Sequence, residues 1–330
     1  MTSHPRDRFD LSPSAAAEAA FVDAQARGRM HHAWLLCGPE GVGKATFAYR
    51  AARRLLGAAT DISRGPLGAR PGDPVSQLIS AQSHPDLLVL ERLSDGGKVK
   101  KSISVDQARD LPEFFSKSPS QASHRVAIID AADDLNMNAA NALLKVLEEP
   151  PERGVLFLIS HAAGRLLPTI RSRCRRLTFA PWTDAAVADL IETKTELAGE
   201  EAARIAVMAR GSPGAALDLA SAANLEVDRL AQAWVAAPAV ERAEQMAIAD
   251  GFRGAEGQAR FESLIDRLAA AVKARSLAEG AAGAAWADLW TRLSDLPDRA
   301  AAINLDRADL LNGALADLAR VKAQAAMGGR

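Results

Sequence analysis

The stretch HHAWLLCGPEGVGKATFAYRAARRLL, residues 31–56, decides the fold class. Its apolar run over residues 33–37 predicts a buried strand, and the helix formers over residues 46–56 predict a helix after it. Between them, residues 38–44 have the pattern of a P-loop, in which backbone N–H groups and a helix N-terminus surround phosphate oxygens and a lysine reaches the outer phosphates. The residues expected to cradle phosphate are Gly38, Gly41, Gly43 and Lys44.

The magnesium ligands of an active P-loop site are incomplete. Ala45 follows the loop lysine, where a Ser or Thr hydroxyl normally binds Mg²⁺. Thr46 lies one position further, about 100° around the helix, which makes it a poor substitute. The apolar run RVAIID ends in Asp130, which suits a metal ligand, but Ala131 stands where active ATPases carry a water-orienting Glu. Two such differences in one site predict that the chain does not hydrolyse ATP.

Predicted strands and helices alternate through the first 180 residues. The further strands are expected at 86–92, 125–130, 154–160 and 175–179. A first helix is expected at 15–28, and helices between the strands at 105–115 and 136–149. This alternation predicts an open parallel α/β sheet, with its ligand at the carboxyl ends of the strands. Residues 57–75, with four Gly and three Pro, are expected to form a loop. Asp133 and Asp134 are interpreted as a solvated acidic turn or a helix cap.

After Pro181 the sequence predicts helices alone. Gly211 can end one helix, Ser212 can cap the next, and Pro213 suits the first turn of that helix. From about residue 224 onward, apolar side chains recur at helical spacing, which is typical of helix-packing faces rather than of a site. These stripes are Trp286, Leu289, Trp290 and Leu293, and Leu311, Leu315 and Leu318.

Composition narrows the class of protein. The 40 basic residues nearly balance the 41 acidic ones, so bulk charge does not indicate a nucleic-acid binder. Cys37 and Cys174 lie far apart in the sequence, which argues against a disulfide framework or a cysteine-built zinc site and fits a reducing compartment. The polar N-terminus and the absence of a long apolar run predict a cytoplasmic protein without a membrane partner.

The segment PTIRSRCRRL, residues 168–177, has four Arg in six positions and by itself is typical of a basic surface. Together with HHAWLLCGPEGVGKAT and NAANALLKVLEEPP, however, this segment points to a family rather than to a merely basic surface. The three segments resemble the delta-prime subunits of the bacterial DNA polymerase III clamp loader, members of the AAA+ superfamily. The resemblance spans roughly residues 15–220, and Ser172-Arg173-Cys174 is its most specific signature.

The resemblance implies three domains. They are an AAA+ P-loop-type α/β domain with a parallel sheet over residues 1–180, a small helical lid over 181–223, and an all-α collar over 224–330 that joins the subunits of a ring. It also implies a rigid subunit that does not hydrolyse ATP and that presents Arg173 as an arginine finger to the neighbouring ATPase. Such a finger is worth about 10³ to 10⁵ in rate in comparable systems.

The implied partners are the ATPase subunits of the gamma/tau type and the delta subunit within the DNA polymerase III holoenzyme. Contact with the sliding clamp and primed DNA is implied through that complex, which loads the clamp during replication.

Active relatives have an Arg at the position of Gly214 in the lid, in addition to the hydroxyl and Glu that are missing here. Ser160, at the end of the predicted strand 154–160, matches the position that senses the outer phosphate, and a helix or turn cap is an equal interpretation. Many relatives bind zinc through a four-cysteine insert. Residues 57–86 occupy that region and contain no Cys, which predicts no zinc.

Two other functions are compatible with parts of the pattern. One is an active AAA+ motor ATPase or helicase of the same superfamily, against which Ala45 and Ala131 count. The other is a nucleotide-regulated adaptor, against which the Ser172-Arg173-Cys174 signature counts. Without a complete magnesium site, Gly41, Gly43 and Lys44 could still cradle the phosphates of ATP or ADP without hydrolysis.

Overall fold

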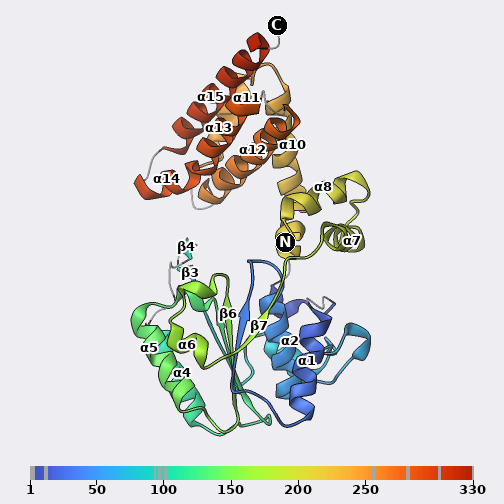
Figure 1. Ribbon diagram of the computed structural model, residues 1–330, viewed down its shortest axis with the longest axis vertical. Helices are drawn as coiled ribbons and strands as arrows, with labels where there is room; N and C mark the ends of the chain where they lie inside the picture. The colour runs from blue at the N-terminus through green and yellow to red at the C-terminus, as the bar shows by residue number, and fades with distance from the viewer. Residues whose placement is uncertain are drawn as a thin grey trace. The chain divides into compact units, whose positions relative to one another are not determined.

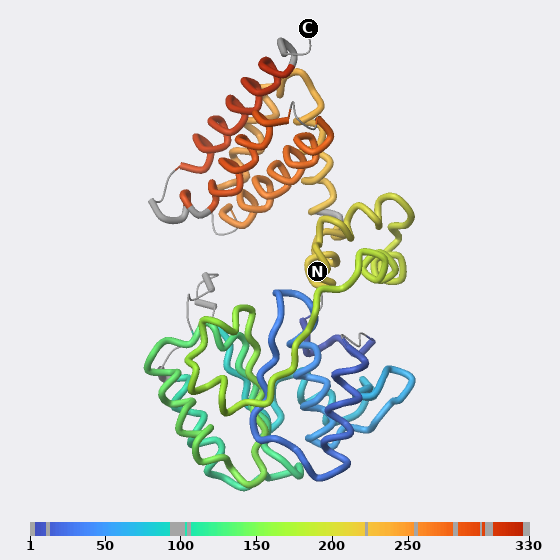
Figure 2. The backbone as a smooth tube through the Cα atoms, in the orientation of Figure 1, coloured from blue at the N-terminus to red at the C-terminus, as the bar shows by residue number. Residues whose placement is uncertain are grey.

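The fold is described from a computed structural model, which divides into two compact units, Met1–Leu217 and Asp218–Arg330 (Figures 1 and 2). The structure describes residues 4–10, 14–92, 94–95, 98–99, 103, 105–253, 257–279, 283–303 and 306–328. The expected boundaries at residues 180 and 223 stay predictions.

A five-stranded parallel sheet forms the middle layer of the first unit, as the sequence predicts. Its strand order is β2-β5-β6-β1-β7, and all four neighbouring pairs are parallel. The bounds are β1 Ala33–Cys37, β2 Leu87–Glu91, β5 Arg125–Asp130, β6 Gly154–Ser160 and β7 Arg175–Thr178. A separate antiparallel pair joins β3, Ser94–Asp95, to β4, Lys98–Val99.

Helices cover both faces of this sheet, as Figure 1 shows. One face packs against α1 (Ala15–Ala26), α2 (Lys44–Leu56) and α3 (Pro74–Ser80), and the other against α4 (Val105–Ser116), α5 (Met137–Glu148) and α6 (Pro168–Ser172). Short 3₁₀ turns lie at Pro5–Asp7, Ile62–Arg64, Ala132–Asp134 and Ala163–Arg165. The sequence interpretation missed α6.

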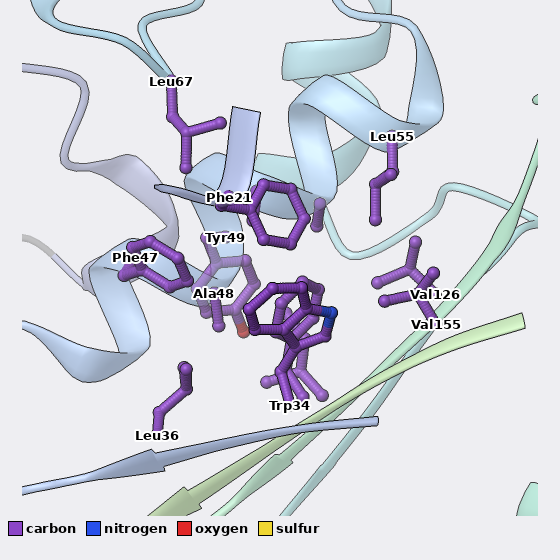
Figure 3. Close-up of a cluster of buried hydrophobic side chains, with 14 of the residues drawn as sticks. Phe21, Trp34, Leu36, Phe47, Ala48, Tyr49, Leu55, Leu67, Val126 and Val155 are labelled. Atoms are coloured by element: carbon purple, nitrogen blue, oxygen red, sulfur yellow. The ribbon is translucent and has the colours of Figure 1, made fainter. Parts of the chain in front are cut away.

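The two cores arise because strand side chains alternate between faces. On β1, Trp34 and Leu36 lie in the core beneath α1 and α2, whereas Leu35 and Cys37 lie in the opposite core. Figure 3 shows the first of these cores, where the ring of Phe21 meets that of Trp34 at a centroid distance of 5.0 Å.

The insert after α2 is more regular than the expected loop. An antiparallel bridge pairs Thr60 with Ala69, and α3 begins at Pro74, inside the segment predicted to be irregular. The carboxylate of Asp73 accepts hydrogen bonds from the first turn of α3, which is the ordinary chemistry of a helix N-cap. The prediction of a loop to residue 75 was therefore wrong at its end, because an Asp-Pro pair was counted as a breaker when it is also a helix start.

A buried ion pair anchors this insert to the helices. The carboxylate of Glu18 on α1 accepts from Arg50 on α2 at 2.7 and 3.0 Å, and both side chains are buried. The second oxygen of Glu18 also accepts from the backbone N–H of Leu67, at 3.0 Å, and Arg50 donates to the backbone carbonyl of Arg64. Two helices and the insert are thus joined at one point, in the region where the resemblance implies zinc in many relatives.

Among the residues described after β7, helices are the regular elements. They are α7 (Asp184–Lys194), α8 (Glu200–Ala209) and α9 (Pro213–Leu219), then α10 (Ala222–Ala236), α11 (Arg242–Asp250), α12 (Gly257–Glu279), α13 (Ala284–Ser294), α14 (Leu296–Ile303) and α15 (Arg307–Gly328). The turn before α9 is as predicted: Gly211 has φ +75°, and the Ser212 hydroxyl accepts from the N–H of Ala215 at 3.1 Å.

The second unit is a helical bundle with a core of its own. The predicted stripes on α13 and α15 lie in it: Leu289 and Leu311 are fully buried, and Trp290 packs against the cluster. Within the part of the chain that the structure describes, no helix has both the length and the apolar character needed to cross a membrane.

We expect Glu18→Gln to lower the free energy of unfolding by about 3–5 kcal/mol, because it leaves the buried charge of Arg50 without its partner. Asp23→Asn is the matched control on the same helix. It breaks the exposed pair between Asp23 and Arg27 and is expected to cost less than about 1 kcal/mol. Urea denaturation of the full chain measures both, and equal losses would contradict the anchoring role of Glu18.

Candidate functional site

Three neighbouring strands bring the predicted P-loop residues to one edge of the sheet. The loop follows β1, Asp130 ends β5 and Ser160 ends β6, and these strands are adjacent in the order β5-β6-β1. Cys37 and Ser160 are direct register partners. The predicted residues thus lie at the carboxyl ends of adjacent parallel strands, and their role as a ligand site stays a prediction.

The glycines of the loop are required by its backbone. Gly38 has φ +148°, and a Cβ atom on it would lie 2.3 Å from the carbonyl oxygen of Phe179. Gly43 has φ +100° and is the N-cap of α2, so the helix starts at the loop lysine itself. Only glycine adopts such conformations at low cost, which explains their spacing.

Lys44 is turned toward its own loop. Its buried ammonium donates to the backbone carbonyls of Gly38, at 2.6 Å, and Pro39, at 2.5 Å. Burial lowers the pKa of Lys44 to about 8, and the carboxylates of Asp130 and Glu40 only partly oppose this shift. The Lys44 ammonium, which reaches phosphate oxygens in a nucleotide-binding P-loop, is thus bonded to backbone oxygens here.

Acidic side chains border the same cavity. Burial, reinforced by the nearby carboxylate of Glu91, raises the pKa of Asp130 to about 6, although Lys44 favours its charged form. The cavity measures about 230 Å³ and is lined by Pro5, Arg8, Glu40, Gly41, Gly43, Lys44, Ala45, Thr46, Asp130, Ile159, His161 and Gly214.

The first turn of α9 lies directly on the P-loop. The N–H of Gly214 donates to the carbonyl of Gly41 at 3.0 Å, and a Cβ atom on Gly214 would be 3.1 Å from the Gly41 Cα. Gly41 has φ +75°, and a Cβ atom on it would lie 2.1 Å from the Ser212 hydroxyl. The two backbones are thus in close contact, and a side chain at position 214 would press on Gly41.

Ser160 and Asp133 bond to each other. The buried Ser160 hydroxyl donates to the Asp133 carboxylate at 2.8 Å, and the same carboxylate accepts from the backbone N–H groups of His161 and Ala162. Asp133 therefore organises the end of β6 rather than lying in solvent as part of an acidic turn. Ser160 does not cap a helix.

The structure brings together most of the predicted phosphate-site residues. Gly41, Gly43, Lys44, Thr46 and Asp130 line the cavity, whereas Gly38 and Ser160 do not. Sequence reasoning missed Arg8 and His161. His161 directly follows the predicted strand 154–160, which was an available signal; Arg8 comes from an N-terminal segment that no motif marks.

These residues do not fit a magnesium–triphosphate. The loop offers Ala45 where a hydroxyl ligand is needed, and its lysine is bonded to backbone carbonyls. The cavity of about 230 Å³ is also below the range of about 300–1,000 Å³ that is usual for small-molecule sites. No hydrolytic step follows from this arrangement.

Arg173 belongs to a second, exposed site. It is the C-cap of the short helix α6, and its guanidinium donates to the carbonyl of Thr169 at 3.1 Å and pairs with the carboxylate of Glu148 at 3.1 Å. Its side chain is 38% exposed, and it does not line the P-loop cavity. Arg175 and Arg176 follow on the edge strand β7 and are exposed, with Arg175 stacked over the ring of Trp34.

A parallel sheet in this order, with a P-loop after its β1 strand and helices after its β7 strand in the described sequence, defines a P-loop α/β protein of the AAA+ type. The family model described as "DNA polymerase III, delta subunit" matches residues 14–183, and the chain belongs to that family. The resemblance seen in the sequence is thereby confirmed.

Individual relatives support membership of the same family. Over 158 residues the chain is 41% identical to DNA polymerase III subunit delta' of Pseudomonas aeruginosa, covering 48% of this chain and 45% of the relative. Over 169 residues it is 37% identical to the Bacillus subtilis protein of the same name, covering 50% and 47%. The chain thus spans about half the length of the curated relatives it matches.

A solved structure shares the fold over a longer stretch. It is a DNA polymerase III gamma subunit-related protein from Thermotoga maritima, with a TM-score of 0.54 and 17% identity, covering 91% of this chain and 98% of that one. At this identity the likeness concerns the fold alone.

We expect Gly41→Ala to be less stable than Gly57→Ala by about 0.5–2 kcal/mol, because the added methyl group displaces the Ser212 hydroxyl from its N-cap hydrogen bond with Ala215. Gly57→Ala is the matched control: it also has a positive φ, +92°, but nothing within 4 Å, so it reports only the left-handed backbone cost of about 1–2 kcal/mol. In urea denaturation, the double variant Gly41→Ala/Ser212→Gly should have a free energy of unfolding closer to that of Gly57→Ala than Gly41→Ala has. No difference between the two single variants would contradict the tight contact between α9 and the P-loop.

Proposed function

We propose that this chain is a non-hydrolysing delta-prime-type subunit of the DNA polymerase III clamp loader, which helps to load the sliding clamp onto primed DNA. The observation that carries the proposal is that one chain combines a P-loop closed by its own residues with an arginine at its surface. Family membership and relatives named DNA polymerase III subunit delta' support it.

The proposal that this chain does not hydrolyse ATP rests on contacts in the P-loop. Lys44 is bonded to the carbonyls of Gly38 and Pro39, and the backbone of Gly214 is bonded to that of Gly41. A triphosphate would have to break both sets of hydrogen bonds and would then find no hydroxyl ligand for its magnesium at residue 45. The loop in this chain acts as a structural turn that holds α9 against α2.

Arg173 is proposed to act in trans on the nucleotide of a neighbouring ATPase subunit of the gamma/tau type. A guanidinium is permanently charged and planar, and it presents a fork of donors that matches phosphate oxygens. The side chain is partly exposed at the end of a short helix, which suits contact across a subunit interface.

The remaining expectations belong to the same proposal. The helices from about residue 224 onward form the oligomerisation collar, which contacts the gamma/tau-type and delta subunits. The complex works in the cytoplasm, and the insert over residues 57–86 needs no zinc, because the Glu18–Arg50 pair and the Thr60–Ala69 bridge hold it.

The isolated chain is expected to have no ATPase activity above background. The measurement is release of phosphate from magnesium–ATP by the purified chain, with Lys44→Ala as the blank for a contaminating enzyme. A turnover of about one per second, within the ordinary range for enzymes, that disappears in Lys44→Ala would refute the proposal in favour of an active motor ATPase.

Arg173→Ala should leave the chain able to join the complex but slow ATP hydrolysis by the reconstituted loader about tenfold or more. A finger is worth about 10³ to 10⁵ at the site it serves, so a loss of this size is expected if hydrolysis at that site limits the turnover of the loader. Arg173→Lys should recover little, because an ammonium lacks the planar fork. The assay is steady-state ATPase activity with clamp and primed DNA.

Arg176→Ala is the control for a merely basic surface, because loss of one exposed charge is cheap in salt. Arg175→Ala is a second control, which in addition loses the contact with Trp34. If all three alanine variants had equal, small effects, the trans-acting role of Arg173 would have to be abandoned.

A further inference from the structure

The carboxylate that pairs with Arg173 comes from another element of the fold. No Asp or Glu occurs between His161 and Thr183, a stretch that contains five Arg. Of these five, all of which lie in the described part of the chain, Arg173 is the one that forms an ion pair, with Glu148 at the end of α5. The geometry therefore singles out the guanidinium to which the proposed function assigns a role.

Glu148 does not stabilise the helix on which it lies. It is the last residue of α5, where the negative end of the helix dipole disfavours a carboxylate. The pair is also too exposed to contribute much to the fold, since the two side chains are 38% and 52% accessible. Its consequence is local: it fixes where the Arg173 side chain lies.

One ion pair and one hydrogen bond hold the guanidinium at different terminal nitrogens. The Glu148 carboxylate lies 3.1 Å from Nη2, and the Thr169 carbonyl accepts a hydrogen bond from Nη1 at 3.1 Å. An arginine has five N–H donors, so donors remain for a second anion while both contacts stay in place. A flexible arginine would instead lose rotamer freedom each time it met that anion.

We propose that Glu148 is the positioning residue for Arg173: it holds the guanidinium ready to meet a nucleotide phosphate of the neighbouring subunit. This inference rests on the proposed function of Arg173 and adds the residue that orients it. Glu148 touches no nucleotide itself, and its effect passes through the arginine.

The test compares Glu148→Gln and Glu148→Ala with Glu149→Gln in the reconstituted loader. Glu149 is the matched control, an exposed neighbour that does not pair with Arg173. We expect Glu148→Gln to lower kcat for ATP about two- to fivefold, the range that corresponds to an exposed ion pair. Glu148→Ala should lower it at least as much. KM for ATP, assembly and thermal stability should not change, and Glu149→Gln should match the wild type.

The double variant Glu148→Gln/Arg173→Ala separates positioning from a general structural role. If Glu148 acts through Arg173, the double variant has the same kcat as Arg173→Ala alone. A further drop in that background, an equal effect of Glu149→Gln, or an unchanged or increased kcat in Glu148→Gln would overturn the inference. If Arg173→Ala slows hydrolysis but Glu148→Gln does not, only the positioning role fails; if Arg173→Ala has no effect, the proposed function of Arg173 fails as well.

Discussion

The buried contact between Glu18 and Arg50 is the interaction on which the first unit depends. Two opposite charges can stay in a core only if each satisfies the other and the remaining polar atoms find partners. Here the partners are backbone groups of the insert, including the N–H of Leu67, so α1, α2 and the insert are fixed together. Since α2 begins at Lys44, the same contact also fixes the helix that carries the P-loop.

The P-loop has the backbone shape of a phosphate-binding loop, but its polar groups form hydrogen bonds within this protein. Its glycines still adopt the positive φ values that the turn requires, and α2 still starts at the lysine. Backbone carbonyls now receive the lysine, and the N–H of Gly214 bonds to Gly41. In an active site, phosphate oxygens accept from the lysine and a mobile lid responds to them. In this chain, hydrogen bonds within the protein take that place, which suits a subunit whose shape does not follow a nucleotide cycle.

In the proposed function, the residue that acts on a nucleotide lies outside the P-loop. Arg173 is separate from the P-loop cavity and is partly exposed, and its guanidinium is held by an ion pair with α5 and a hydrogen bond to α6. A closed P-loop and an oriented arginine are complementary: a subunit that needs no conformational change of its own can present the arginine in a constant place.

The sequence alone determined the parallel sheet, the P-loop and the helical second half, because these depend on local patterns: apolar runs for β1, β5 and β6, glycine spacing, and helical periodicity on α13 and α15. The missing hydroxyl at Ala45 and the missing carboxylate at Ala131 were also evident from the sequence, because a missing functional group is a property of one position. The tertiary structure decided the rest. The bond from Ser160 to Asp133 and the close approach of Gly214 to Gly41 depend on residues that meet only after folding. A pattern along the chain records which side chains are present, whereas the partner that each one meets is set by the packing of distant segments.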